Sequence, residues 1–367
     1  MESRIKTLTV TEHARQRQGC YLHCGPQHAF WELFNGWTML MDFACAGISW
    51  EHPSRIDIDA QNGKCLLHVT GNVSTEKVFK LLAKVIACTG DAELPVEFPS
   101  GAVFNGGCRG GEDKGFLDTI SLMLVIAYSQ NVRLRVVYEK QSIEMTLQGD
   151  SIKSLEHSQS EEANQWYLDF TPNPQYISEV DIGKAFQREC FRRVCAYSDA
   201  LSICVRGHEM REFSGTRTWL ELVAPSPYYL RRTANIRVLV PRKFEVAFSF
   251  RPGTERRYEI FCAGHISGGQ PRQLLENAFE SYIAEFFGEA ALPKIKGLGF
   301  VAVLSILELD DIIRQSPVSN DCLINDGSEL HAKIKATLRN TFRDLTSLHN
   351  LIKEEYGLNV LANAPVV

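Results

Sequence analysis

The spacing of apolar residues predicts a mixture of helices and strands in the first two hundred residues. The stretch from Gln27 to Ala46 is mostly apolar and is interrupted only by Gly36, which indicates a buried helix. The alternating residues 55–60 and the run 64–69 flank Asn62-Gly63, a dipeptide that supplies the positive φ of a tight hairpin turn. Further strands are predicted at 133–138, 142–147, 165–170 and 200–205, further helices at 75–87, 116–128 and 182–196, and a surface loop at 157–164.

The rest of the chain predicts three strands, an amphipathic helix, a long strand and a closing helix. These elements are expected at 236–240, 244–250, 258–263, 270–287, 299–309 and 332–356. A strand that follows a helix in this way indicates a crossover back into the same sheet. The polar stretch 207–215 is the predicted boundary between two domains, 1–212 and 213–367, and the fold class is α+β.

Composition narrows the class of protein. Of the 367 residues, 44% are hydrophobic and 23% charged, the balance of a globular chain, and no apolar run is long enough to predict a membrane span. The residues after Met1 do not form a signal peptide, and the 11 cysteines are scattered, so we expect reduced thiols and a cytoplasmic location. The net charge of -5 gives no overall reason to bind nucleic acid.

Six stretches, taken in order, are similar to segments of one known family. They are Arg15–Tyr21, His28–Asn35, Met41–Gly47, Arg55–Asp59, Phe244–Phe250 and Gly299–Leu309. Together they resemble the N-terminal half of the DNA gyrase B protein and of its topoisomerase IV counterpart. The resemblance implies a GHKL (Bergerat-type) ATPase-like domain, which is a sandwich of helices on a mixed sheet, followed by a ribosomal-S5-like α/β transducer domain.

The resemblance also allows the ATP site to be compared residue by residue. It places the catalytic base at Glu32, and it calls for an asparagine four residues later that holds Mg²⁺, where this chain has Gly36. Asn35 is one residue short of that place, a rotation of roughly 100° about a helix. Asp42 matches a family residue by its surroundings and not by its distance from Glu32.

Three other elements of the family's ATP site are also altered. Val69 stands where the family's aspartate reads the adenine amino group, and of the glycines around it only Gly71 remains. The stretch 115–121 matches the phosphate loop but keeps one glycine, and 315–317 stands where a Gln-Thr-Lys loop is expected, with no lysine before Lys333. We therefore predict that the architecture persists without ATP hydrolysis, topoisomerase activity or a bound cofactor.

The leading functional hypothesis is a non-catalytic relative that acts by binding. The entry segment around Tyr21 suggests self-association into a homodimer, and a gyrase-like subunit or DNA are candidate partners. A predicted basic face for DNA phosphates consists of Arg231, Arg232, Arg237 and Arg242, although the same residues fit a solvated sheet face.

Two alternatives remain open from the sequence. Apolar residues replace polar ones around the former cleft, namely Trp37, Met41, Val69, Phe116 and Leu117. They either fill the cleft or line a pocket for an apolar small molecule, with Glu32 as acid or base beside Asp42 and His28. The other alternative is an ATPase with a divergent site.

The group Cys20, His23, Cys24 and His28 has spacings typical of zinc ligands, but no second ligand pair is evident, so no metal is predicted.

Overall fold

A computed structural model gives the fold of the chain. It describes residues 10–18, 37, 40–48, 52–89, 122–149, 151–177, 182–210, 215–224, 235–240, 244–262, 265–306, 312–314, 321–324, 329–343 and 345–362. The chain divides into two compact units. The first holds the described residues of 1–46, 52–190 and 201–210, and the second holds those of 47–51, 191–200 and 211–367.

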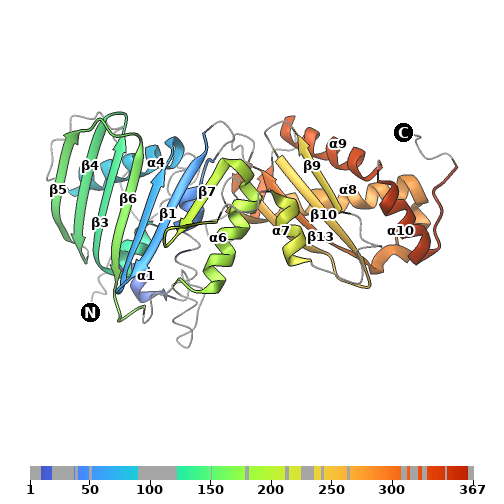
Figure 1. The fold of residues 1–367 in the computed structure, drawn as a ribbon, viewed down its shortest axis with the longest axis horizontal. Coiled ribbons are helices and arrows are strands. Elements are labelled where there is room, and N and C mark those ends of the chain that lie inside the picture. The colour runs from blue at the N-terminus through green and yellow to red at the C-terminus, as the bar shows by residue number, and fades with distance from the viewer. Residues whose placement is uncertain are drawn as a thin grey trace, which may run out of the picture. The chain divides into compact units, whose positions relative to one another are not determined.

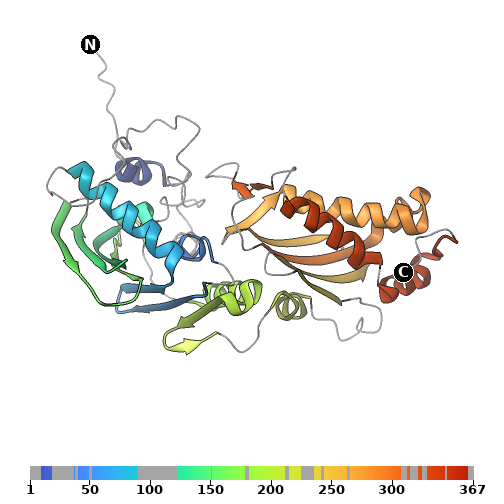
Figure 2. The ribbon, with the colours of Figure 1, turned by 90° about the horizontal axis from the view of Figure 1, so that it is seen from above.

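Within the described residues, the first unit contains an eight-stranded mixed sheet in the order β5-β4-β3-β6-β2-β1-β7-β8 (Figure 1). Its strands are β1 (Ser54–Gln61), β2 (Lys64–Thr70), β3 (Ser129–Tyr138), β4 (Gln141–Gln148), β5 (Ser151–Gln159), β6 (Gln165–Pro172), β7 (Leu201–Val205) and β8 (His208–Glu209). Only the β1–β7 pair is parallel among them. Helices α1 (Val10–Gln16) and α4 (Asn72–Thr89) lie on one face of the sheet (Figure 2), and α6 (Lys184–Tyr197) precedes β7.

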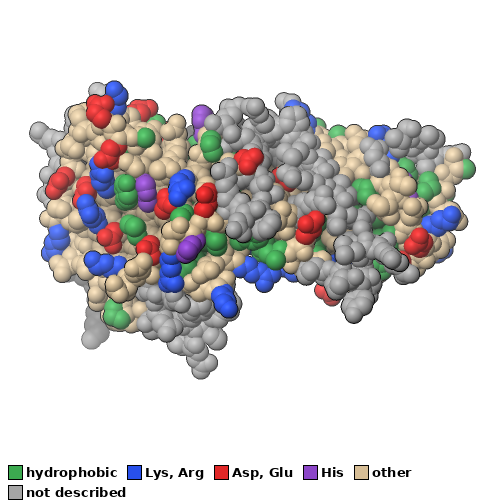
Figure 3. Space-filling view, viewed as in Figure 1, with side chains coloured by type: hydrophobic (Ala, Val, Ile, Leu, Met, Phe, Trp, Pro, Cys, Tyr) green, Lys and Arg blue, Asp and Glu red, His purple; other side chains and the backbone are tan. Residues whose placement is uncertain are grey.

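The two faces of this sheet differ because side chains alternate along each strand. On β1, Ile56 and Ile58 are buried beneath the helices, while Asp57 and Asp59 are only partly covered. Figure 3 shows the other face, where basic and acidic side chains are interspersed. Ion pairs cross that face between strands, as between Arg133 and Glu144 at 2.7 Å. The helical layer therefore buries the core, and the opposite face is polar.

Most predicted elements of this unit are confirmed, and one prediction is wrong. The β1–β2 turn is at Asn62-Gly63, with φ of 52° and 75°. The polar stretch 157–164 is not a loop throughout, because β5 continues to Gln159 and pairs with β4. No side chain of β5 is buried, so this edge strand lacks the apolar alternation by which strands are found.

The second unit contains seven described strands in the order β14-β15-β12-β11-β13-β10-β9. They are β9 (Asn235–Val240), β10 (Phe244–Pro252), β11 (Arg257–Cys262), β12 (His265–Gly269), β13 (Leu298–Ile306), β14 (Ile312–Arg314) and β15 (Asp321–Ile324). Helix α8 (Gln270–Phe287) lies between β12 and β13, and β13 pairs parallel to β11, so the predicted crossover is confirmed. The short strand β12 was not predicted.

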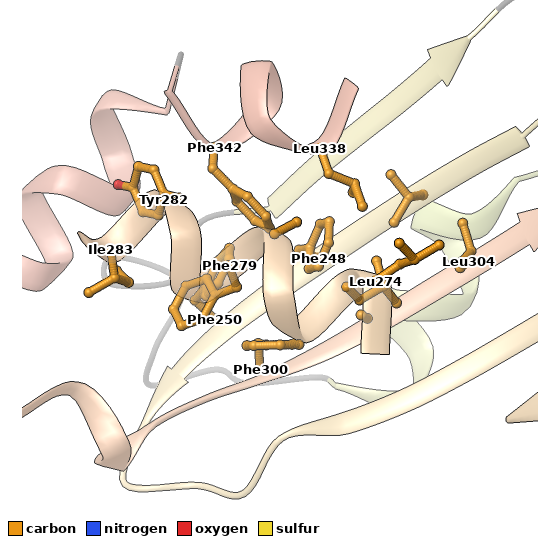
Figure 4. Close-up of a cluster of buried hydrophobic side chains, with 14 of the residues drawn as sticks. Phe248, Phe250, Leu274, Phe279, Tyr282, Ile283, Phe300, Leu304, Leu338 and Phe342 are labelled. Carbon is orange, nitrogen blue, oxygen red and sulfur yellow. The ribbon is translucent and has the colours of Figure 1, made fainter. Parts of the chain in front are cut away.

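Helices cover both faces of this second sheet. Figure 2 shows α8 and α9 (Glu329–Arg343) on one face and α7 (Thr216–Val223) on the other. The α8 side holds the larger core, in which aromatic rings of β10, β13, α8 and α9 meet (Figure 4). The ring of Phe342 on α9 lies 5.0 Å from that of Phe248 and 5.8 Å from that of Phe279. These contacts fix the helical layer on the sheet.

A buried carboxylate holds α7 in place on the opposite face. Glu245 of β10 is fully buried, and its Oε1 accepts hydrogen bonds from the Thr216 backbone N–H at 3.0 Å and from the Thr216 hydroxyl at 2.7 Å. Thr216 is the first residue of α7, where backbone N–H groups have no partner within the helix. The Glu245 carboxylate therefore caps the N-terminus of α7, and the same two hydrogen bonds give its buried Oε1 atom hydrogen-bond donors.

The closing helix predicted at 332–356 is two helices, α9 and α10 (Thr346–Tyr356). Leu345 leaves the helical conformation, with φ of -96° and ψ of 79°, and the second helix begins after it. The break lets Leu348, Leu351 and Ile352 of α10 enter the same core as Phe342. No helix in the described part of the chain has both the length and the apolar character needed to cross a membrane.

Candidate functional site

The described residues that the resemblance places at the end of the catalytic helix are mostly packed into the core of the first unit. Residues 40–45 are helical, and the side chains of Met41 and Phe43 are fully buried. The Phe43 ring meets Trp166 of β6 edge to face at 5.9 Å. Trp37, which is 3% exposed, lies 5.4 Å from the ring of Phe186 on α6. Asp42 is only partly buried.

Val69, near the end of β2, is also packed into the core of the first unit. Val69, at the place where the resemblance requires the adenine-reading aspartate, is fully buried. It is in register with Ile56 on β1 and with Trp166 on β6. An isopropyl group at this position packs against its neighbours and has no atom that can accept a hydrogen bond from a base.

A single residue, Gly71, joins β2 to α4. Its φ is 145°, and a Cβ added there would lie 2.5 Å from the Ser54 hydroxyl oxygen, so the close approach of the two strands requires glycine. The Thr75 hydroxyl donates to the Gly71 carbonyl, and the Trp166 indole N–H donates to the Ser74 hydroxyl at 3.4 Å. Two hydroxyls of the first turn of α4 therefore already bond within the unit.

The remaining predicted residues of the cleft stay predictions. Glu32, His28, Phe116 and Leu117 lie outside the described residues, as do the Cys20–His28 group and residues 315–317. Of those that are described, Trp37, Met41 and Val69 are all buried in the first unit. The resemblance predicts these three residues at a cleft, and in the structure their side chains pack within the core of the first unit.

The predicted basic face lies mostly outside the described residues as well. Arg231, Arg232 and Arg242 are not described, while Arg237 is in β9, in register with Ala247. Among neighbouring arginines, Arg257 pairs with the buried Glu259 at 2.7 Å. Arg256 lies over the rings of Phe279 and Phe300, at 5.1 and 5.6 Å. At least two of these guanidinium groups therefore serve the packing of the second unit.

The described cysteines are buried thiols. They are Cys45, Cys65, Cys190, Cys195, Cys204, Cys262 and Cys322, and none of these seven forms a disulfide. Burial, with a smaller effect of Glu245, raises the pKa of the Cys195 thiol to about 12, and burial also raises the pKa of Cys65. Such thiols are unreactive at neutral pH. In the described ranges no group of three His, Cys, Asp or Glu side chains is placed to hold a metal ion.

A groove of about 620 Å³ is present at one end of the first sheet, away from the residues predicted to line a pocket. Its wall consists of Arg15, Ser129, Gln130, Asn131, Gln148, Gly149, Asn173 and Tyr176. These residues come from the last turn of α1, the start of β3, the end of β4 and the segment after β6. Four segments that are separated in the sequence form the groove, so no local pattern could have predicted it.

The arrangement of elements identifies the fold by comparison with solved structures. The chain is 15% identical to the DNA gyrase B protein of Myxococcus xanthus, with a TM-score of 0.58 over 93% of this chain and 98% of that one. It is 12% identical to the ATPase region of Saccharomyces cerevisiae topoisomerase II, with a TM-score of 0.63 over 96% and 98%. It is 13% identical to the ATPase and transducer domains of Balamuthia mandrillaris topoisomerase II, with a TM-score of 0.58 over 93% and 98%.

The chain has the fold of the ATPase and transducer regions of gyrase B and topoisomerase II. The predicted architecture is thereby confirmed. No protein-family model and no curated protein matches the sequence. The similarity to these three structures is one of backbone fold, because the sequence identities are only 12–15%. The gyrase-B-like fold extends over both units.

Proposed function

We propose that this gyrase-B-like chain does not hydrolyse ATP and acts by self-association and by binding a partner or DNA. The observation that carries the proposal is the buried Val69, where the resemblance implies that nucleotide recognition needs an aspartate. A base whose amino group finds no acceptor loses a hydrogen bond, and a buried donor left unpaired costs roughly 1–3 kcal/mol.

The surroundings of Val69 support the same proposal. β2 passes into α4 through Gly71 alone, and the first-turn hydroxyls of α4 bond within the unit. Met41 and Phe43 are buried beside aromatic residues of the sheet. The described part of the former site thus offers apolar packing, which favours a filled cleft over a pocket for an apolar small molecule.

The catalytic half of the proposal is tested with the purified full chain and Mg²⁺-ATP. We expect no phosphate release above background, and no binding of a non-hydrolysable ATP analogue by calorimetry. An authentic gyrase B ATPase region, assayed in parallel, shows that the conditions support turnover. Turnover by the wild-type chain that is lost in Glu32→Gln would contradict the proposal and establish an active, divergent ATPase.

The binding half of the proposal concerns assembly. The regions with this fold belong to gyrase B and topoisomerase II, and the resemblance implies dimerisation when ATP is bound. If this chain dimerises without nucleotide, contacts between the two protomers must stabilise the dimer interface without help from bound ATP. Sedimentation velocity at micromolar concentration should then show a dimer that is unchanged by ATP analogues. A monomer under both conditions would rule out self-association and leave partner or DNA binding to be tested by gel shift.

A further inference from the structure

The first sheet ends in two edge strands of very different length. β8 at one edge has two residues, whereas β5 at the other edge has nine (Figure 1). Among the described strands β5 pairs only with β4, so one row of its backbone N–H and C=O groups faces away from the sheet. A long edge of this kind is a template on which a further strand can pair, whereas a two-residue edge is too short for that.

The part of β5 that is protected against such pairing is its first half. The register with β4 shifts between Ile152 and Ser154, so Lys153 is an additional residue of β5 and forms a bulge. A bulge and a lysine at an edge both hinder pairing with another chain. Residues 154–159 keep a regular register with β4 and contain no proline. The second half of β5 therefore presents a regular strand edge.

The apolar row on the helix-covered face of the sheet stops at this edge. Leu155 of β5 is in register with Met145 of β4. Met145 is fully buried, whereas Leu155 is only partly buried, because no described strand flanks β5 on the side away from β4. A further strand at this edge would remove the remaining apolar surface of Leu155 from water, which is favourable.

The order of side chains along β5 fits a second copy of the same strand. Opposite residues of an antiparallel pair lie on the same face of the sheet. A register centred on Leu155 places this residue opposite its counterpart, so the apolar row runs from Met145 and Leu155 of one copy to Leu155 and Met145 of the other. A register centred on Glu156 would place two carboxylates opposite each other, which is unfavourable.

The charges of β5 are complementary in the same antiparallel register. Lys153 and Glu156 are exposed, and neither forms an ion pair with another residue that the structure describes. In the register centred on Leu155, Ser154 of one copy lies opposite Glu156 of the other, so the adjacent Lys153 reaches that carboxylate. The two-fold symmetry forms this ion pair twice. A parallel arrangement would instead bring like charges together.

We propose that β5 pairs antiparallel with β5 of a second copy of this chain, centred on Leu155, and joins the two sheets into one. The inference rests on the proposed self-association and names its interface. One pair of short strands gives a small interface, below about 1,200 Å², and such interfaces are weak. We therefore expect a dissociation constant of roughly 1–10 µM.

Charge reversal tests the register, with sedimentation equilibrium of the full chain from about 1 to 100 µM. Lys153→Glu and Glu156→Lys should each weaken the dimer about tenfold, because symmetry applies each change twice. The double variant with both reversals exchanges the two charges and should return the wild-type affinity. Glu354→Lys makes the same change of charge at an exposed position of α10 and should leave the affinity unchanged. An unchanged Tm shows that each variant is folded.

Crosslinking tests the contact at the centre of the interface. Opposite Cα atoms of an antiparallel pair are about 4.5–5.5 Å apart, which a disulfide can span. Leu155→Cys, treated with the thiol oxidant diamide, should therefore form more disulfide-linked dimer on a non-reducing gel than the wild-type chain does.

The outcomes separate this interface from self-association in general. A dimer that both single charge reversals leave unchanged, or Leu155→Cys that crosslinks no more than wild type, would overturn the β5 interface and leave self-association through another surface. A chain that is monomeric over the whole concentration range would overturn the interface and the proposed self-association together.

Discussion

An aspartate at Val69, where the resemblance implies an acidic residue, tests whether this position is packed as the proposed loss of nucleotide binding requires. Val69 is fully buried between Ile56 and Trp166, so an aspartate there meets no water. Keeping that carboxyl neutral at pH 7, against an ordinary pKa of about 3.9, costs about 4 kcal/mol. Loss of the buried methyl groups adds about 2 kcal/mol. We therefore expect Val69→Asp to reduce the free energy of unfolding by about 6 kcal/mol.

The pH dependence gives this prediction its sharpest form. Because the folded-state pKa of the new carboxyl is raised, its penalty is largest at high pH. Relative to wild type, the penalty should shrink by about 1.4 kcal/mol for each pH unit from about 7 to 5. Val69→Asn, which has the same shape and does not ionise, should show a cost that does not vary with pH.

The measurement is urea unfolding followed by circular dichroism, at several pH values, for wild type and both variants. A cost below about 1 kcal/mol for Val69→Asp, with no pH dependence, would show a hydrated side chain and hence an open site. Tight binding of Mg²⁺-ATP by Val69→Asp would refute the reasoning more directly, because it would mean that only the acceptor was missing.

Three other predictions concern the second unit. Phe342→Ala should reduce the free energy of unfolding by roughly 3–5 kcal/mol, measured by urea titration, because its ring is fully buried among other rings. Glu245→Ala should cost roughly 1–3 kcal/mol in the same assay, because the two Thr216 donors lose their acceptor, whereas the exposed Glu354→Ala should change little. Burial lowers the pKa of His349, so its contribution to stability is complete above about pH 6.5 and is lost as pH falls; thermal melts should show this loss in wild type and not in His349→Gln.

The sequence predicted the elements whose signals are local. Asn62-Gly63 fixes its hairpin because those two residues alone decide the turn, and α8 was predicted with its full range because its apolar residues recur at helical spacing. The order of such elements, with six short stretches of resemblance, was sufficient to predict the gyrase-B-like fold. That Val69 stands in place of an aspartate of the ATP site is implied by the resemblance and stays a prediction.

Only the tertiary structure decided the features that depend on distant partners. β5 has no buried face of its own, and pairing with β4 makes it a strand. The helix breaks at Leu345, and this break lets Leu348 pack into the core of the second unit. The spacing of apolar residues in the sequence does not predict it. The groove beside Arg15 depends on four segments that lie far apart in the sequence. The periodicity of apolar residues predicts which face of a helix or strand is buried. Which residues of other segments pack against that face depends on tertiary contacts, and these contacts also form grooves.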